Sequence, residues 1–110
     1  MSLYNMPTSK EILDFINDFS YFGKEVQECF TQGCCYWFAF ILHERFTPYS
    51  EIYYNDLENH FACKIGKNLY DIMGNCNNLY EGEWKRWDNF KNIDSSLAKR
   101  IERDCILKIK

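Results

Sequence analysis

Three residue types that together can carry nucleophilic catalysis lie in the middle of this chain. Two cysteines, Cys34 and Cys35, occur in the segment GCCYWFAF, His60 occurs in NHFACKIG, and Asp71 occurs in NLYDIMG. A thiol nucleophile needs a base that takes its proton and a third group that orients the base. The order cysteine, histidine, aspartate therefore predicts a thiol-based catalytic triad, provided that the secondary-structure elements bring the three side chains together.

The two adjacent cysteines stand at the start of a predicted helix that runs from about Cys34 to Phe46. Unpaired N–H groups and the helix dipole favour negative charge at this end, so a thiolate is stabilised there. On a helical wheel Cys35 shares its face with the apolar stripe expected to pack on a sheet, namely Phe38, Ala39, Leu42 and Phe46. We therefore favour Cys35 as the nucleophile, with Cys34 as the alternative.

The histidine and the aspartate lie on two predicted strands joined by a tight turn. Strand-like runs cover Glu51–Asn55, His60–Ile65 and Asn68–Met73, and Gly66 with Lys67 forms the turn between the last two. A two-residue turn pairs Ile65 with Asn68 and makes His60 and Asp71 diagonal neighbours on one face. Such neighbours lie ~7–8 Å apart at Cα, within hydrogen-bonding reach of their side chains, whereas a three-residue turn would break this parity.

The remaining segments predict an α+β domain over residues 1–110. The segment TSKE has capping-box spacing before a helix that reaches about Phe19, and further helices are expected at residues 24–31 and 94–107. The helix after Cys35 is apolar nearly all round, so we expect it to be buried on all sides. The predicted architecture is N-terminal helices, a central buried helix packed on about three antiparallel strands, an aromatic-rich loop at 74–90, and a C-terminal helix.

Composition excludes several classes of protein. With 46% hydrophobic and 18% aromatic residues in 110, the chain can bury one modest core. Its net charge of −3 comes without a basic patch, so no nucleic-acid partner is expected. The longest apolar run, residues 36–42, is far shorter than the ~20 residues that span a membrane. Without a signal-peptide pattern, we expect a cytoplasmic protein with reduced thiols.

Six cysteines also raise the question of metal binding. Four lie in apolar contexts and are expected to pack as small hydrophobic residues: Cys29, Cys63, Cys76 and Cys105. The alternative is a zinc site drawn from Cys29, Cys34, Cys35, His60, Cys63 and Cys76. Structural zinc sites show paired short ligand spacings, and only HFAC offers such a pair. We therefore expect no metal and no other cofactor.

The segments GCCYWFAF, NHFACKIG and NLYDIMG, between Gly33 and Gly74, resemble the core of papain-like cysteine hydrolases in the broad sense. That superfamily includes the NlpC-type peptidases and the transglutaminase-like enzymes. The chain also resembles small bacterial and phage proteins that carry CYWFA and RF, followed by HF and YD. In the superfamily, the nucleophilic cysteine begins a central helix packed on an antiparallel sheet, and the histidine and its orienting residue come from neighbouring strands.

This resemblance implies that Cys35 is the nucleophile, that His60 is the general base and then the acid, and that Asp71 orients His60. Papain-like peptidases also carry an oxyanion-hole glutamine a few residues before the cysteine. Gln32 is the candidate here but departs from the family's spacing, and Asn59 is a second candidate donor. The other histidine, His43, lies beside charged residues and is expected at the surface.

The expected function is a small cysteine hydrolase or acyltransferase that acts on an amide or peptide bond through a thioester. Its substrate would be a protein or peptide. The alternative is a catalytically silent interaction protein on the same fold, such as a phage- or mobile-element-encoded inhibitor of a host protein. Tyr80, Trp84 and Trp87 could serve as its binding anchors, although the same aromatic residues could simply cover one face of the sheet.

Overall fold

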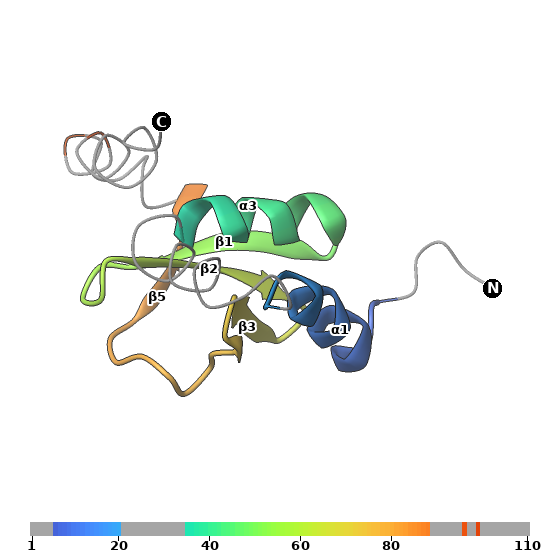
Figure 1. The fold of residues 1–110 in the computed structure, drawn as a ribbon. Helices are drawn as coiled ribbons and strands as arrows, with labels where there is room; N and C mark the ends of the chain where they lie inside the picture. Colours follow the sequence, from blue (N-terminus) through green and yellow to red (C-terminus); the bar gives the residue numbers. More distant parts are fainter. Residues whose placement is uncertain (1–5, 21–34, 89–95, 97–98, 100–110) are drawn as a thin grey trace.

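The computed structural model describes residues 6–20, 35–88, 96 and 99 of the chain. Helix α1 spans Ser9–Ser20 and helix α3 spans Cys35–Arg45. A five-stranded antiparallel sheet follows, in the spatial order β4-β3-β2-β1-β5 (Figure 1). Its strands are β1 (Ser50–Asn55), β2 (His60–Ile65), β3 (Asn68–Asp71), β4 (Gly74–Asn75) and β5 (Trp84–Arg86).

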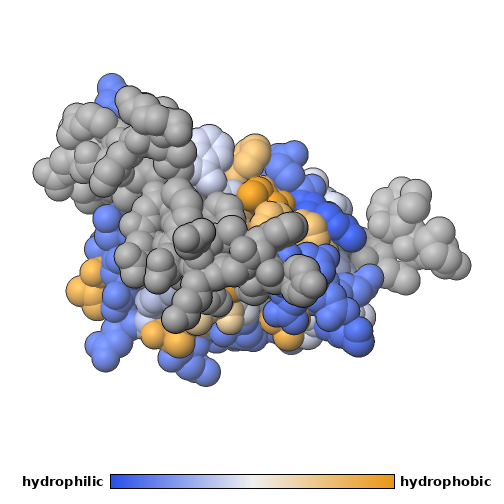
Figure 2. All heavy atoms as spheres, in the orientation of Figure 1, coloured by the Kyte–Doolittle hydropathy of each residue, from blue (hydrophilic) through white to orange (hydrophobic). Residues whose placement is uncertain are grey.

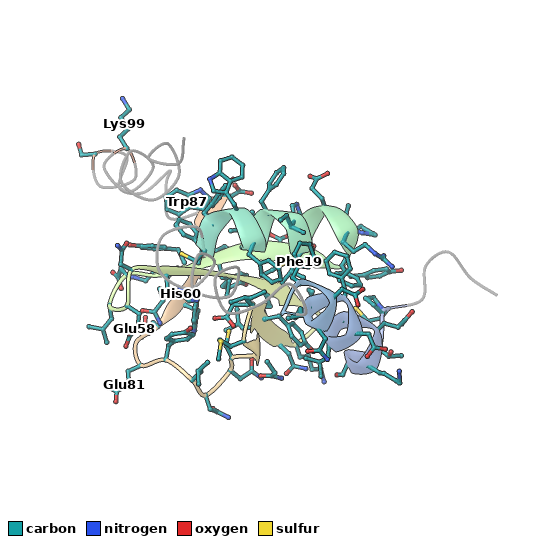
Figure 3. All side chains as sticks on the ribbon, viewed as in Figure 1. Phe19, Glu58, His60, Glu81, Trp87 and Lys99 are labelled. Carbon is teal, nitrogen blue, oxygen red and sulfur yellow. The ribbon has the colours of Figure 1, made fainter. Side chains whose placement is uncertain are left out.

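Helix α1 begins with the capping box that the sequence predicts. The Glu11 N–H donates to Thr8 Oγ1 at 3.1 Å, and the Thr8 N–H donates to Glu11 Oε1 at 2.8 Å. These reciprocal bonds satisfy two donors that a helix start otherwise leaves unpaired. The helix then packs beside α3 through edge-on ring contacts, with the Phe19 centroid 5.3 Å from that of Phe38 (Figure 3).

Helix α3 is not buried on all sides, contrary to the sequence-based prediction. Leu42 is completely buried, together with Cys35, Phe38 and Ala39 on the face toward the sheet. Phe40, by contrast, is 36% exposed, and its ring stacks on that of Tyr36 at 6.4 Å. An apolar helix can therefore keep one side exposed, because aromatic side chains on that side pack against one another.

The turn between β2 and β3 sets the predicted register. Gly66 has a φ of +64°, a conformation that glycine adopts without strain, and Ile65 pairs with Asn68. Strand β2 is the middle strand of the sheet and pairs along its whole length with β1, from Ile65 opposite Ser50 to His60 opposite Asn55. His60 is therefore held at the first position of the central strand.

The predicted architecture is wrong in its sheet. The described residues form five strands, and two of them, β4 and β5, lie inside the segment predicted as an aromatic-rich loop. Strand β3 ends at Asp71, and the chain turns at Ile72 and Met73 to pair back as β4. Strands of two and three residues are too short to show alternating hydrophobicity. The helices predicted at 24–31 and 94–107 fall outside the described residues, apart from Ser96 and Lys99.

Both faces of the sheet are covered. On the α3 side, side chains from both helices and from β1, β2 and β3 form the main core, which also includes Trp87. On the other side Ala62, Leu69 and Cys76 are buried beneath Tyr53, Tyr80 and Trp84. Figure 1 shows the segment between β4 and β5 running along this second side. These aromatic residues thus cover the sheet.

The surface carries single exposed apolar side chains. Leu57, Met73 and Leu79 lie in turns and are exposed. On the face drawn in Figure 2, apolar side chains stand in separate areas among hydrophilic ones. Across residues 6–20 and 35–88, no helix has the length and apolar character needed to cross a membrane.

The one-sided burial of α3 predicts unequal costs for two substitutions on the same helix. Leu42→Ala should lower the free energy of unfolding by about 2–5 kcal/mol, because it leaves a cavity in the core. Phe40→Ala, the matched control on the exposed side, should cost about 1 kcal/mol or less. Urea denaturation followed by circular dichroism measures both, and equal costs would contradict the one-sided packing.

Candidate active site

His60 and Asp71 form a direct, buried pair. His60 Nε2 lies 2.8 Å from Asp71 Oδ2, and the two residues are only 4% and 2% exposed. The residues come from the start of β2 and the end of β3, so the register of the Gly66 turn brings them together. Figure 3 shows His60 on the side of the sheet where the segment carrying Glu81 runs. The predicted contact between these two side chains is confirmed, while their catalytic roles stay a prediction.

Two further donors hold the Asp71 carboxylate. The Met73 N–H donates to Oδ1 at 2.8 Å, and the Tyr80 hydroxyl donates to Oδ2 at 2.9 Å. A buried carboxylate without donors would be costly, and three donors from three segments offset this cost. Because both oxygens are engaged, the carboxylate plane is fixed and presents Oδ2 to His60.

The Cys35 thiol lies at the first position of α3, beside the central strand. The Phe61 N–H donates to Cys35 Sγ at 3.5 Å, and Cys35 is 6% exposed. Pairing between β2 and β3 stops at Cys63 opposite Tyr70. Phe61 still pairs with Tyr54 of β1 but lies beyond the region paired with β3, so its N–H can meet the thiol. The sulfur is therefore anchored one residue away from His60 along β2.

The electrostatics of His60 link all three residues. Burial lowers the pKa of His60, but the hydrogen bond to Asp71, the hydrogen bond and charge of Cys35, and the charge of Asp71 raise it to about 9. His60 is therefore protonated at neutral pH. An imidazolium between a carboxylate and a thiol stabilises the thiolate, which is the nucleophilic form.

The other predicted site residues are placed only in part. Asn59 has a φ of +50°, and its Oδ1 accepts a hydrogen bond from the Tyr54 hydroxyl at 2.6 Å. Its role as an oxyanion donor stays a prediction. Gln32 and Cys34 lie outside the described residues. His43 is half-buried and its Nδ1 lies 2.8 Å from Ser50 Oγ, so it belongs to the contact between α3 and β1.

Two further cysteines are confirmed as buried packing residues. Cys63 lies in the main core and Cys76 lies on the other side of the sheet, both fully buried. Burial raises the pKa of both thiols, that of Cys63 to about 12. Where the structure describes the chain, histidine, cysteine, aspartate and glutamate form no group of three that could hold a metal ion. Cys29 and Cys105 lie outside that part.

Tyr80 is a member of the site that sequence reasoning did not assign to it. Its hydroxyl bonds to Asp71, and its ring centroid lies 4.5 Å from that of His60. Tyr80 sits in the irregular segment NCNNLYEGEW, which has no periodicity from which a contact with β2 or β3 could be inferred. To predict this contact from the sequence, one would have to know where β4 lies, and its two residues carry no recognisable strand pattern.

Comparisons with known proteins identify one family. A family model described as "Phage YunG-like protein" matches residues 12–103, which include Cys35, His60 and Asp71. No curated protein and no solved structure matches the chain.

The raised pKa of His60 predicts how the ring titrates and how stability depends on pH. NMR of the histidine ring should give a pKa of about 9. Asp71→Asn should lower the pKa of His60 toward or below 6.5. Burial lowers this pKa, and the variant lacks the negative charge of Asp71 that opposes the effect of burial. Since the raised pKa belongs to the folded state, His60 adds stability below pH 6.5, and this contribution is lost as the pH rises through about 9.

Urea denaturation at pH 6.5 and at pH 9.5 measures that loss. Between the two pH values the free energy of unfolding should fall more in the wild-type protein than in Asp71→Asn. The variant keeps the other titrating groups, so its own change with pH measures their contribution. A wild-type His60 that titrates near 6.5 would contradict the coupling between the three residues.

Proposed function

The chain belongs to the phage YunG-like protein family, and from the arrangement of Cys35, His60 and Asp71 we propose that it is a cysteine hydrolase or acyltransferase. It acts on an amide or peptide bond and passes through a thioester intermediate. The observation that carries the proposal is the buried His60–Asp71 hydrogen bond, in a ring whose pKa is raised in part by the Cys35 thiol.

The orientation of the imidazole supports this assignment. Nε2 is engaged with Asp71, which leaves Nδ1 as the nitrogen that can exchange a proton with Cys35. A histidine whose two nitrogens serve a carboxylate and a nucleophile is the arrangement that triad chemistry requires. It also favours the finer interpretation, a papain-like or transglutaminase-like relationship, in which a histidine and its orienting residue come from neighbouring strands.

The proposed reaction follows from this arrangement. The Cys35 thiolate attacks the substrate carbonyl, a C–S bond forms, and the carbonyl π electrons move to oxygen. When that oxyanion collapses, the C–N bond breaks and the leaving amine takes the proton of the His60 imidazolium. Water or a second amine, deprotonated by His60, then attacks the thioester, and the C–S bond breaks to restore the thiolate and imidazolium.

The developing oxyanion needs hydrogen-bond donors close to Cys35. The backbone N–H of Cys35 is the first candidate, since it belongs to the start of α3, where the helix dipole favours negative charge. Asn59 and Gln32 remain the proposed second donors. A substrate of protein or peptide character is proposed because the chemistry acts on amide carbonyls.

A second candidate function is favoured by the burial of all three groups. Cys35, His60 and Asp71 are each buried, and a substrate carbonyl has to reach Sγ before any reaction can begin. A catalytically silent member of the family, acting by binding a protein of the host cell, would need no such access. The reactivity of the Cys35 thiol separates the two candidates.

Iodoacetamide alkylation followed by peptide mass spectrometry tests the proposal. At neutral pH, Cys35 in the native protein should be alkylated about tenfold or more faster than an unperturbed thiol, because a neighbouring histidine activates a thiol nucleophile. His60→Ala should remove this advantage. Cys63 and Cys76 are internal controls and should stay unmodified, because both are buried and their pKa values are raised.

Two variants extend the test to catalysis. Cys35→Ala should abolish amide hydrolysis or acyl transfer on a peptide library, whereas Cys63→Ala should retain it after correction for stability. If wild-type Cys35 reacts no faster than a free thiol and His60→Ala changes nothing, the hydrolase proposal is wrong and the interaction protein is the better assignment.

A further inference from the structure

Tyr80 contacts both partners of the buried pair. Its hydroxyl lies 2.9 Å from Asp71 Oδ2, the same oxygen that meets His60 Nε2, and its ring lies 4.5 Å from the His60 ring at an interplanar angle of 37°. A tyrosine that only covered an apolar surface would not need to place its hydroxyl on a carboxylate. The double contact indicates a role in holding the pair.

The hydroxyl of Tyr80 acts as a donor. A carboxylate can only accept hydrogen bonds, so the proton in this contact belongs to the tyrosine. Burial, then the charge and hydrogen bond of Asp71, then the nearby thiols of Cys76 and Cys35 raise the pKa of Tyr80. The phenol therefore keeps its proton throughout the pH range in which a thiol enzyme works, and it also lies within electrostatic reach of the nucleophile.

The two contacts restrict two different rotations. The hydrogen bond from Tyr80, together with that from the Met73 N–H to the other oxygen, prevents the Asp71 carboxylate from turning away from β2. The ring contact limits rotation of the imidazole about its Cβ–Cγ bond, because the centroid of the phenol ring lies only 4.5 Å from that of the imidazole. Nε2 is thereby kept on Asp71 and Nδ1 is kept available to the thiol.

The segment that carries Tyr80 is itself anchored to the sheet. Asn55 Nδ2 donates to the Glu81 carbonyl at 2.8 Å. Gly82 has a φ of +96°, and a Cβ there would lie 2.8 Å from both Asn55 Oδ1 and Leu57 Cβ. Only glycine allows this close approach. The other end of the segment is held to β3, where the Leu69 N–H donates to Asn77 Oδ1 at 2.7 Å. Tyr80 is therefore positioned between an anchor at the end of β1 and one on β3.

We propose that Tyr80 is a positioning residue of the triad, which fixes Asp71 through its hydroxyl and His60 through its ring. The inference rests on the proposed function, since it assigns Tyr80 to the same site. It extends the three predicted residues to four, contributed by α3, β2, β3 and the segment between β4 and β5.

Tyr80→Phe removes the hydroxyl and keeps the ring, so the cover of the sheet remains. Tyr53→Phe is the matched control, because Tyr53 packs on the same side of the sheet and its ring faces the Lys64 ammonium at 5.2 Å. We expect Tyr80→Phe to slow alkylation of Cys35 at neutral pH about tenfold, the effect of one hydrogen bond to a charged group. Tyr53→Phe should leave the rate unchanged.

Two further measurements separate positioning from simple packing. The Nε2–H proton of His60 should give a downfield, slowly exchanging NMR signal in the wild type, and this signal should be lost in Tyr80→Phe. In an Asp71→Asn background, Tyr80→Phe should cause no additional loss of Cys35 reactivity, because Tyr80 acts through Asp71. Thermal unfolding of each variant records any general loss of stability.

The proposal is overturned if Tyr80→Phe leaves the alkylation rate of Cys35 unchanged, as Tyr53→Phe should. It is also overturned if the losses of reactivity caused by Tyr80→Phe and Asp71→Asn add in the double variant. A wild-type protein without the protected Nε2–H signal would overturn it as well, and that measurement does not depend on the folding of any variant. The NMR signal does not depend on thiol chemistry. An inert wild-type Cys35 would therefore refute the proposed function alone, and the NMR comparison would still decide the role of Tyr80.

Discussion

The structure around the candidate site depends on the burial of one carboxylate. Asp71 is almost completely removed from water, and a charge in that position is tolerated only when it is paired and hydrogen-bonded. Its three donors come from β2, from the turn after β3 and from the segment before β5. The buried Asp71 carboxylate thus connects β2, the turn after β3 and the segment before β5 through side-chain hydrogen bonds. Catalysis by a cysteine would exploit this requirement, since the same pair that satisfies Asp71 also keeps His60 charged beside the thiol.

The parts of this arrangement that follow local rules could be predicted from the sequence. The capping box starts α1, and the turn at Gly66 fixes the pairing of β2 with β3, from which the meeting of His60 and Asp71 follows. Both depend on residues close together in the chain. The choice of Cys35 over Cys34 depends on a residue outside the described part, so it stays a prediction.

The parts that failed depend on packing between distant segments. Strands β4 and β5 form because they pair with β3 and β1. Neither has an alternating hydrophobic pattern of its own, so the sequence predicts too few strands. The exposed side of α3 was predicted to be buried, because an apolar sequence does not specify how many neighbours surround a helix. Tyr80 reaches the site through an anchor at Asn55 and a glycine that permits close approach, and neither feature has a sequence signature.

The buried pair also bears on how this family can change over evolutionary time. Removing one partner of a buried ion pair leaves the other charge unsatisfied, which is strongly destabilising, whereas replacing both by apolar residues is often neutral. A lineage in which one of the two residues was replaced would therefore be under pressure to replace the other as well. Relatives that keep both, or neither, would be the stable outcomes. The joint presence of His60 and Asp71 in this chain is one of these two outcomes, and the cost of burying an unpaired charge is sufficient to keep the two residues together.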